Sequence, residues 1–343
     1  MNIAGRPIGP DHLPYVIAEI SNNHLADPER ACRLIELASK TGADAVKIQT
    51  YDADALTIDC DRPEFIIRTP PWTGLNYYQL YRKIALPAAC TERLFRVGRD
   101  SGITVFSSPF DERAVALLES LNCPAYKIAS FEICDDPLLK AVAATGRPVL
   151  VSTGIANLSD IQVSLRVLHE AGCRDLALLH CVSQYPADVA DMNLRALDRL
   201  AAFGCAVGLS DHSLSDLAAV AAVARGAVVL EKHFTRSRAD GGPDAEFSLE
   251  PEEFAHLVRS VRQTWQALGD ADVLTQARRP GAEHARSLFI VRPVAAGESI
   301  EASHVRAIRP GLGLPPRSLP SVVGRRARRD LARGEPLRWE DIE

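Results

Sequence analysis

The sequence predicts a TIM barrel, the (β/α)8 fold, followed by a small second domain. Eight short apolar runs recur between residues 15 and 230, and helical patterns follow nearly all of them. Eight such units in roughly 250 residues match the size of this fold. Polar residues gather directly after the runs, where the active sites of barrels are built. A doubly wound open sheet is the alternative, but no glycine-rich phosphate fingerprint follows the first run.

Strand and helix boundaries follow from the local pattern. The expected strands are residues 15–20, 45–48, 103–106, 125–128, 148–151, 176–179, 205–209 and 227–230. Asp27 is expected to cap a helix that begins with Pro28, and Asp111 to cap the helix after the third strand. The apolar spacing of residues 215–225 and 252–268 predicts the last two helices.

Residues 52–87 interrupt this rhythm with prolines and the aromatic side chains Trp72, Tyr77, Tyr78 and Tyr81. A long insertion after the carboxyl end of a strand usually covers or lines a site, although an ordinary surface excursion is the alternative. Residues 1–270 are assigned to the barrel, residues 271–285 to a linker and residues 286–343 to a small arginine-rich domain. That arginine content is typical either of a solvated face or of a lid over an acidic ligand.

Composition excludes several classes of function. The net charge of −5 gives no reason to expect a nucleic-acid or membrane partner. No apolar run approaches a membrane span, and the first residues lack the core of a signal peptide. The eight cysteines form no C-x-x-C pair and are typical of reduced residues. We therefore expect a cytoplasmic globular protein.

Cationic and hydroxyl side chains recur at the expected strand ends. They are Lys47, Ser108, Lys127, Ser130, Ser152, Ser183 and Ser210. Such a ring suits a substrate with phosphate and carboxylate groups, because lysines supply charge and hydroxyls supply directional bonds. Glu19, Glu132 and Asp244 are carboxylates for proton transfer or for holding sugar hydroxyls. One serine alone at a strand end is more often structural.

Ser210, Asp211 and His212 follow the expected strand 205–209, and Glu231, Lys232 and His233 follow the expected strand 227–230. From neighbouring strand ends His212 and His233 could share one metal ion and leave positions open for water or substrate. Imidazole suits Mn, Fe, Co or Zn. Either histidine alone is more often a hydrogen-bonded structural residue.

The ordered motifs of the chain resemble the sialic acid synthase family. They are IAEISNNH, GADAVKIQTY, FSSPFD, YKIASFE, VSTGIA, HCVSQYP, GLSDHS and EKHF, with IRPGLGLPP near the C-terminus. The resemblance implies condensation of phosphoenolpyruvate (PEP) with an open-chain amino sugar, giving a nine-carbon nonulosonic acid and phosphate. It also implies a divalent metal, Mn or Mg with Co possible, and a homodimer whose C-terminal antifreeze-like (SAF) domain swaps over the partner's barrel.

The same resemblance implies roles for individual residues. His212 and His233 would hold the metal, and the seven lysine and serine residues of the ring would bind PEP. The sugar would face Glu19, Gln49, Tyr185 and Asp244, with Arg309 reaching in from the partner's small domain. Glu132 is the expected acid/base, with Glu19 and Lys127 as further catalytic residues.

Local details favour one branch of this family. Phe131, Ser183 and Ala245 differ from the residues usual in sialic and legionaminic acid synthases, and Trp72-x-Gly74 and Phe247-Ser248-Leu249 resemble the pseudaminic acid branch. Gly242-Pro243-Asp244 is more like the sialic branch. An apolar Phe131 fits a 6-deoxy sugar. The alternatives are a neuraminate or legionaminate synthase, another PEP-condensing enzyme such as a 3-deoxy-heptulosonate synthase, and a non-catalytic sugar- or phosphate-binding barrel.

Overall fold

The computed structural model describes residues 1–68, 72–275 and 280–343. It divides into two compact units, Met1–Gly269 and Asp270–Glu343. Residues 69–71 of the predicted insertion and residues 276–279 of the predicted linker lie outside the described residues.

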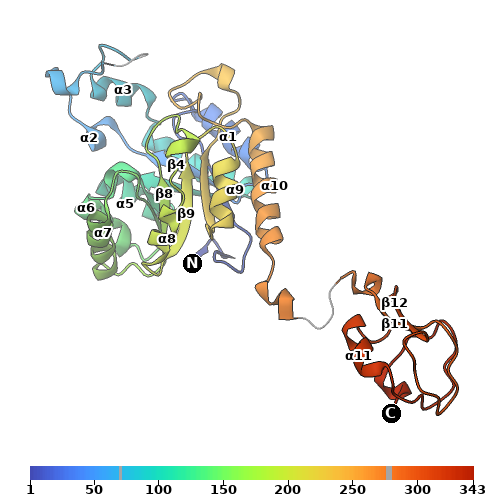
Figure 1. Ribbon diagram of the computed structural model, residues 1–343. Coiled ribbons are helices and arrows are strands. Elements are labelled where there is room, and N and C mark those ends of the chain that lie inside the picture. Colours follow the sequence, from blue (N-terminus) through green and yellow to red (C-terminus); the bar gives the residue numbers. More distant parts are fainter. Residues whose placement is uncertain (69–71, 276–279) are drawn as a thin grey trace. The chain divides into compact units, whose positions relative to one another are not determined.

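The first unit is a closed barrel of eight parallel strands with helices around it (Figure 1), so the predicted fold is confirmed. The strands are β3 Tyr15–Glu19, β4 Ala45–Thr50, β5 Thr104–Pro109, β6 Tyr126–Ile128, β7 Val149–Ser152, β8 Leu176–Cys181, β9 Ala206–Asp211 and β10 Val229–His233. The helices between and after them are α1 Pro28–Ala38, α4 Thr91–Asp100, α5 Glu112–Ser120, α6 Asp136–Ala144, α7 Leu158–Glu170, α8 Ala196–Ala201, α9 Leu217–Ala224 and α10 Pro251–Leu268.

Helix starts follow the expected capping chemistry. The side chain of Asp27 accepts a hydrogen bond from the amide of Glu29, and Pro28 is the first residue of α1. Asp111 accepts from the amide of Ala114 at the start of α5. The apolar face of α1 is buried against the barrel, which explains its 3.6-residue periodicity.

The strands extend beyond the apolar runs that predicted them. Expected strand 227–230 begins at Val229 and continues through His233, and expected strand 205–209 continues through Asp211. The expectation that Ser210, Asp211, Glu231, Lys232 and His233 follow the strands was therefore wrong. Backbone pairing continues through these polar residues, whose side chains alternate between the two sides of the strand.

Gly208 is required by the close approach of β9 to β10. A Cβ atom at this position would lie 2.3 Å from the carbonyl oxygen of Val229 and 2.5 Å from Cδ2 of Leu179. The absence of a side chain lets the strand carrying Ser210 lie against the strand carrying Glu231, with which Ser210 is in register.

In the described part of the insertion after β4, the α-helices are α2 Ala53–Leu56 and α3 Tyr77–Ile84 (Figure 1). Asn76 caps α3 in a capping box with Gln79. At the amino terminus β1 Asn2–Ile3 and β2 Arg6–Pro7 form a short antiparallel pair. Within the described residues, no helix combines the length and apolarity that crossing a membrane requires.

The second unit has its own small apolar core, which includes Leu288, Ile290 and Leu337. Strands β11 Ser287–Ile290 and β12 Val305–Ile308 pair antiparallel, and α11 Leu319–Val322 follows them. The hydroxyl of Ser287 donates to the carbonyl of Pro310 at 2.7 Å and accepts from the amide of Gly313 at 2.9 Å. These bonds fix the backbone that follows β12.

Candidate active site

A pocket of about 420 Å³ opens at the carboxyl ends of the barrel strands. Most of the predicted site residues line it: Glu19, Lys47, Gln49, Lys127, Ser130, Glu132, Ser152, Tyr185, Ser210, His212, His233 and Asp244. Ser108 and Ser183 are not part of the lining, but they form hydrogen bonds with the lining residues Lys47 and Ser130, respectively. The strand register brings these side chains together, since Glu19 pairs with Lys47 and with His233, and Ser210 pairs with Glu231.

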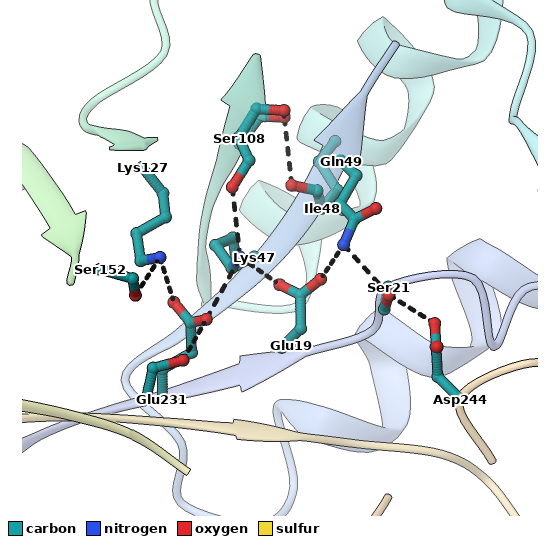
Figure 2. Close-up of polar contacts among 12 residues, drawn as sticks. Glu19, Ser21, Lys47, Ile48, Gln49, Ser108, Lys127, Ser152, Glu231 and Asp244 are labelled. Carbon is teal, nitrogen blue, oxygen red and sulfur yellow. Dashed lines mark hydrogen bonds and ion pairs between the residues drawn. The ribbon is translucent and has the colours of Figure 1, made fainter. Parts of the chain in front are cut away.

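Lys47 is the centre of a buried charge network (Figure 2). Its Nζ lies 3.0 Å from Oε2 of Glu19, 3.2 Å from Oε1 of Glu231 and 3.2 Å from Oγ of Ser108. The ammonium group of Lys47 thus forms two ion pairs and donates a hydrogen bond to Ser108. Ser108 therefore orients Lys47 as well as lying near the pocket.

Lys127 occupies the opposite side of Glu231 in Figure 2, with its side chain 2% exposed. Its Nζ donates to Oγ of Ser152 at 2.7 Å and lies 4.0 Å from Oε2 of Glu231. That oxygen has no hydrogen-bond partner among the described residues. The positive charges of Lys47 and Lys127 thus lie beside the carboxylates of Glu19 and Glu231 in the pocket.

Burial and these charges shift the pKa values of the four groups in different directions. Burial raises the pKa of Glu19, and the nearby ammonium of Lys47 offsets only part of this effect. Burial also disfavours the charged form of Glu231, but Lys127 and Lys47 outweigh burial and lower its pKa. Burial lowers the pKa of Lys127. For Lys47 the two carboxylates outweigh burial, so its pKa is raised.

A cradle of hydroxyl and amide groups lies beside Lys127. Ser183 donates to Oγ of Ser130 at 3.0 Å, and the amide of Ile155 donates to the same oxygen at 3.0 Å. A Cβ atom at Gly154 would lie 2.3 Å from Oγ of Ser183 and 2.7 Å from Oγ of Ser130. The glycine therefore keeps open the space between the strand ends of β6, β7 and β8.

Beside Lys47, the side of the pocket formed by β3 and β4 carries amide, hydroxyl and carboxylate groups. Gln49 donates from Nε2 to Oε1 of Glu19 at 3.0 Å and to Oγ of Ser21 at 3.1 Å (Figure 2). Ser21 in turn donates to Oδ2 of Asp244 at 2.6 Å. Amide, hydroxyl and carboxylate groups in this arrangement suit the hydroxyl groups of a sugar.

Glu132 and Phe131 belong to a short 3-10 turn, Ser130–Glu132, directly after β6. Burial raises the pKa of Glu132, and its Oε2 has no hydrogen-bond partner among the described residues. A carboxyl group with a raised pKa and an oxygen that has no hydrogen-bond partner suits acid/base work. Phe131 is 59% exposed and forms an apolar wall of the pocket with Leu56 and Phe110.

His212 and His233 lie side by side, with ring centroids 5.3 Å apart. Burial lowers the pKa of both imidazoles, which keeps them neutral as metal binding requires. Nδ1 of His212 lies 2.8 Å from the carbonyl of Val182, and Nδ1 of His233 is buried without a partner among the described residues. Two neutral rings, one with an unsatisfied buried nitrogen, fit a divalent cation. The described ranges contain no cluster of three His, Cys, Asp or Glu side chains that could hold a metal, so the pair would supply two ligands.

Arg309 lies in the second unit. It is exposed and directly follows β12. Its predicted contact with a sugar in a partner subunit remains a prediction.

Sequence reasoning missed several lining residues. Glu231 is the main one, and Ser21, Asn22, Tyr51, Leu56, Phe110 and Cys181 also line the pocket. The alternation within Glu231-Lys232-His233 is the signal that could have identified Glu231, since positions 231 and 233 share one side of a strand. Tyr51 donates to Oδ1 of Asn22 at 2.8 Å, a contact across 29 residues that no local pattern indicates.

The fold and this pocket define a TIM-barrel protein with a charged cavity at the carboxyl ends of its strands. Residues 34–273 match the NeuB family model, and residues 285–343 match that of the SAF domain. The chain belongs to the NeuB family. The resemblance drawn from its motifs is thereby confirmed.

Similar proteins cover nearly the whole chain. It is 38% identical to a pseudaminic acid synthase of Campylobacter jejuni, over 97% of this chain and 98% of the relative. It is 36% identical to a pseudaminic acid synthase of Helicobacter pylori, over 96% of this chain and 98% of the relative. The crystal structure of an N-acetylneuraminic acid synthetase from Leptospira borgpetersenii matches with a TM-score of 0.73 and 30% identity, covering 82% of this chain and 93% of the other.

Proposed function

We propose that this protein is a pseudaminic acid synthase. It condenses PEP with an open-chain 2,4-diacetamido-2,4,6-trideoxy hexose of the altrose type and water, and it releases phosphate. The observation that carries this proposal is the pair of buried lysines, Lys47 and Lys127, within a hydroxyl-lined pocket beside two neutral histidines. Its near full-length similarity to two pseudaminic acid synthases supports the same conclusion.

The lysine side of the pocket would hold PEP. Lys127 and Lys47 supply charge, and Ser130, Ser152 and Ser210 supply hydroxyl groups for the phosphate and carboxylate oxygens. Burial strengthens these interactions, because few water molecules compete for the same donors.

The proposed reaction balances as follows. C3 of PEP forms a bond to the aldehyde carbon, water adds to C2, and the bond between C2 and the phosphate oxygen breaks. Of the two protons of water, one ends on the former aldehyde oxygen and the other leaves with phosphate. Glu132 transfers a proton beside C2, and Glu19 serves the aldehyde side. A divalent cation held by His212 and His233, Mn or Mg with Co possible, would supply Lewis acidity toward a carbonyl oxygen.

The opposite wall would select the sugar. Gln49, Asp244 and Tyr185 face the sugar's polar groups, while Phe131, Leu56 and Phe110 provide apolar surface. A 6-deoxy sugar with acetamido methyl groups can cover this surface, whereas a 6-hydroxyl group would lose hydration there.

The C-terminal unit would complete the site in a homodimer. Arg309 directly follows β12, and the bonds of Ser287 hold the backbone after it. Its planar guanidinium can donate to several sugar oxygens at once, and a swapped two-fold dimer would bring it to the partner's pocket.

Product analysis tests the proposal. The full-length protein is incubated with Mn²⁺, PEP and either the diacetamido trideoxy altrose or the precursor aldoses of neuraminate and legionaminate synthases. We expect phosphate release and a nonulosonic acid mass with the altrose sugar, and neither with an E132Q variant. Preferred turnover of another aldose would show that the substrate is wrong. No phosphate release with any of them would refute the synthase activity.

A further inference from the structure

Lys232 is a buried charged residue that the proposed mechanism does not use. It lies between Glu231 and His233 on β10, is 1% exposed, and does not line the pocket. Its Nζ donates to Oδ2 of Asp211 at 2.6 Å, to Oγ of Ser213 at 3.2 Å and to the carbonyl of Ser215 at 3.1 Å. All three N–H donors of the ammonium group are therefore engaged.

The three acceptors belong to one short segment, residues 211–215, and this segment contains His212. Asp211 is the last residue of β9 and pairs in register with Lys232. Its second oxygen accepts from the amide of Ser213 at 2.8 Å, which folds the segment back on itself. One lysine thus connects the segment carrying His212 to the strand carrying His233.

The energetics of a buried ion pair indicate why this contact is ionic. Desolvation cancels much of the attraction between two buried charges, so apolar side chains of similar size would stabilise the barrel at least as well. What an ion pair adds is direction, because each donor must point at its acceptor. Here Lys232, which directly precedes His233, donates to Asp211 and Ser213, the two residues that flank His212.

We propose that Lys232 and Asp211 are positioning residues that set the separation and orientation of the two imidazoles, and thereby the affinity of the site for a divalent cation. This inference rests on the proposed function, which assigns the metal to His212 and His233. With the Lys232–Asp211 ion pair formed, the ring centroids of His212 and His233 lie 5.3 Å apart. Without Lys232, residues 211–215 lose three hydrogen bonds, and the ring of His212 is left with the carbonyl of Val182 at 2.8 Å and Sγ of Cys181 at 3.9 Å as its polar contacts.

The test measures Mn²⁺ binding by the full-length protein, from the electron paramagnetic resonance signal of free Mn²⁺. The variants are K232M, D211N and the double variant D211N/K232M, which leaves no unpaired buried charge. We expect about 10- to 100-fold weaker Mn²⁺ binding in each, as for other residues that orient metal ligands. The double variant should be no weaker than the worse single variant, because both remove one interaction. PEP affinity measured without metal should not change.

Asp44 offers a matched control at the opposite end of the barrel. Its carboxylate is 6% exposed and pairs with Arg6 and Arg262, far along the strands from either histidine. D44N should lower the unfolding temperature and leave Mn²⁺ affinity unchanged. Equal weakening by D44N, or wild-type Mn²⁺ affinity in the folded K232M, D211N and double variants, would overturn the inference. If instead H212A and H233A bind Mn²⁺ like the wild type, the metal assignment in the proposed function is wrong.

Discussion

Replacing Lys127 by methionine tests the proposed PEP site most directly. The change keeps the length of the side chain but removes an ammonium group that is 2% exposed and donates to Ser152 at 2.7 Å. Truncating one partner of a buried charge pair costs about 3–5 kcal/mol. At about 1.4 kcal/mol per factor of ten, PEP binding should weaken by about two to three and a half orders of magnitude. The lower end is favoured, because loss of Lys127 raises the pKa of Glu231 and protonation of that carboxyl relieves repulsion of PEP.

The assay is isothermal titration of PEP into the protein without sugar, together with the Michaelis constants of both substrates. Lys83→Met is the matched control, since Lys83 is exposed over the ring of Trp72 in the insertion. The control should bind PEP like the wild type. If Lys127→Met changes PEP affinity less than tenfold and shifts only the Michaelis constant of the sugar, the assignment of Lys127 is wrong.

Three further predictions follow from the same site. Gly154→Ala would place a Cβ atom 2.3 Å from Oγ of Ser183, and such overpacking costs about 1–3 kcal/mol. We expect weaker PEP binding with a circular dichroism spectrum that shows an intact fold. Unchanged PEP affinity would contradict a role of the Ser130 and Ser183 cradle in binding PEP. Burial already raises the pKa of Glu19, and bound PEP adds negative charge beside it, so PEP binding should take up protons. Calorimetric titrations in buffers of different ionisation enthalpy measure this uptake. The same observed binding heat in every buffer would refute it. Mixed dimers of inactive Arg309→Ala and inactive His212→Ala chains should regain activity, because one site then has an intact barrel and an intact arginine; mixed dimers that form and stay inactive would exclude action in trans.

The fold was predictable because its signals are local and repeat. Each apolar run, cap and amphipathic stretch depends on residues close in sequence, as the bonds from Glu29 to Asp27 and from Ala114 to Asp111 show. Strand ends were less accurate, since hydrophobicity ends at Leu230 while backbone pairing continues to His233. Where a strand enters a polar pocket, its side chains no longer report its extent.

The candidate site was only partly predictable, because its contacts join distant segments. The two histidines, two lysines and most serines could be found from their positions near strand ends. The bond from Ser21 to Asp244 spans 223 residues, and Ser21 itself adopts a left-handed φ of 39° that its sequence context does not indicate. Glu231 was missed because the sequence pattern placed it after a strand. It lies within β10, and its carboxylate lies between the ammonium groups of Lys47 and Lys127.

Strand β10 explains how one short segment serves three tasks. Its alternation sends Glu231 and His233 into the pocket and Lys232 to the outer side of the barrel. Glu231 balances the lysines that would receive PEP, His233 supplies half of the proposed metal pair, and Lys232 holds the segment that carries the other half. A register slip of one residue would exchange these sides at every position, so the pairing of β10 with β3 and β9 determines both the charge of the pocket and the geometry of its histidines.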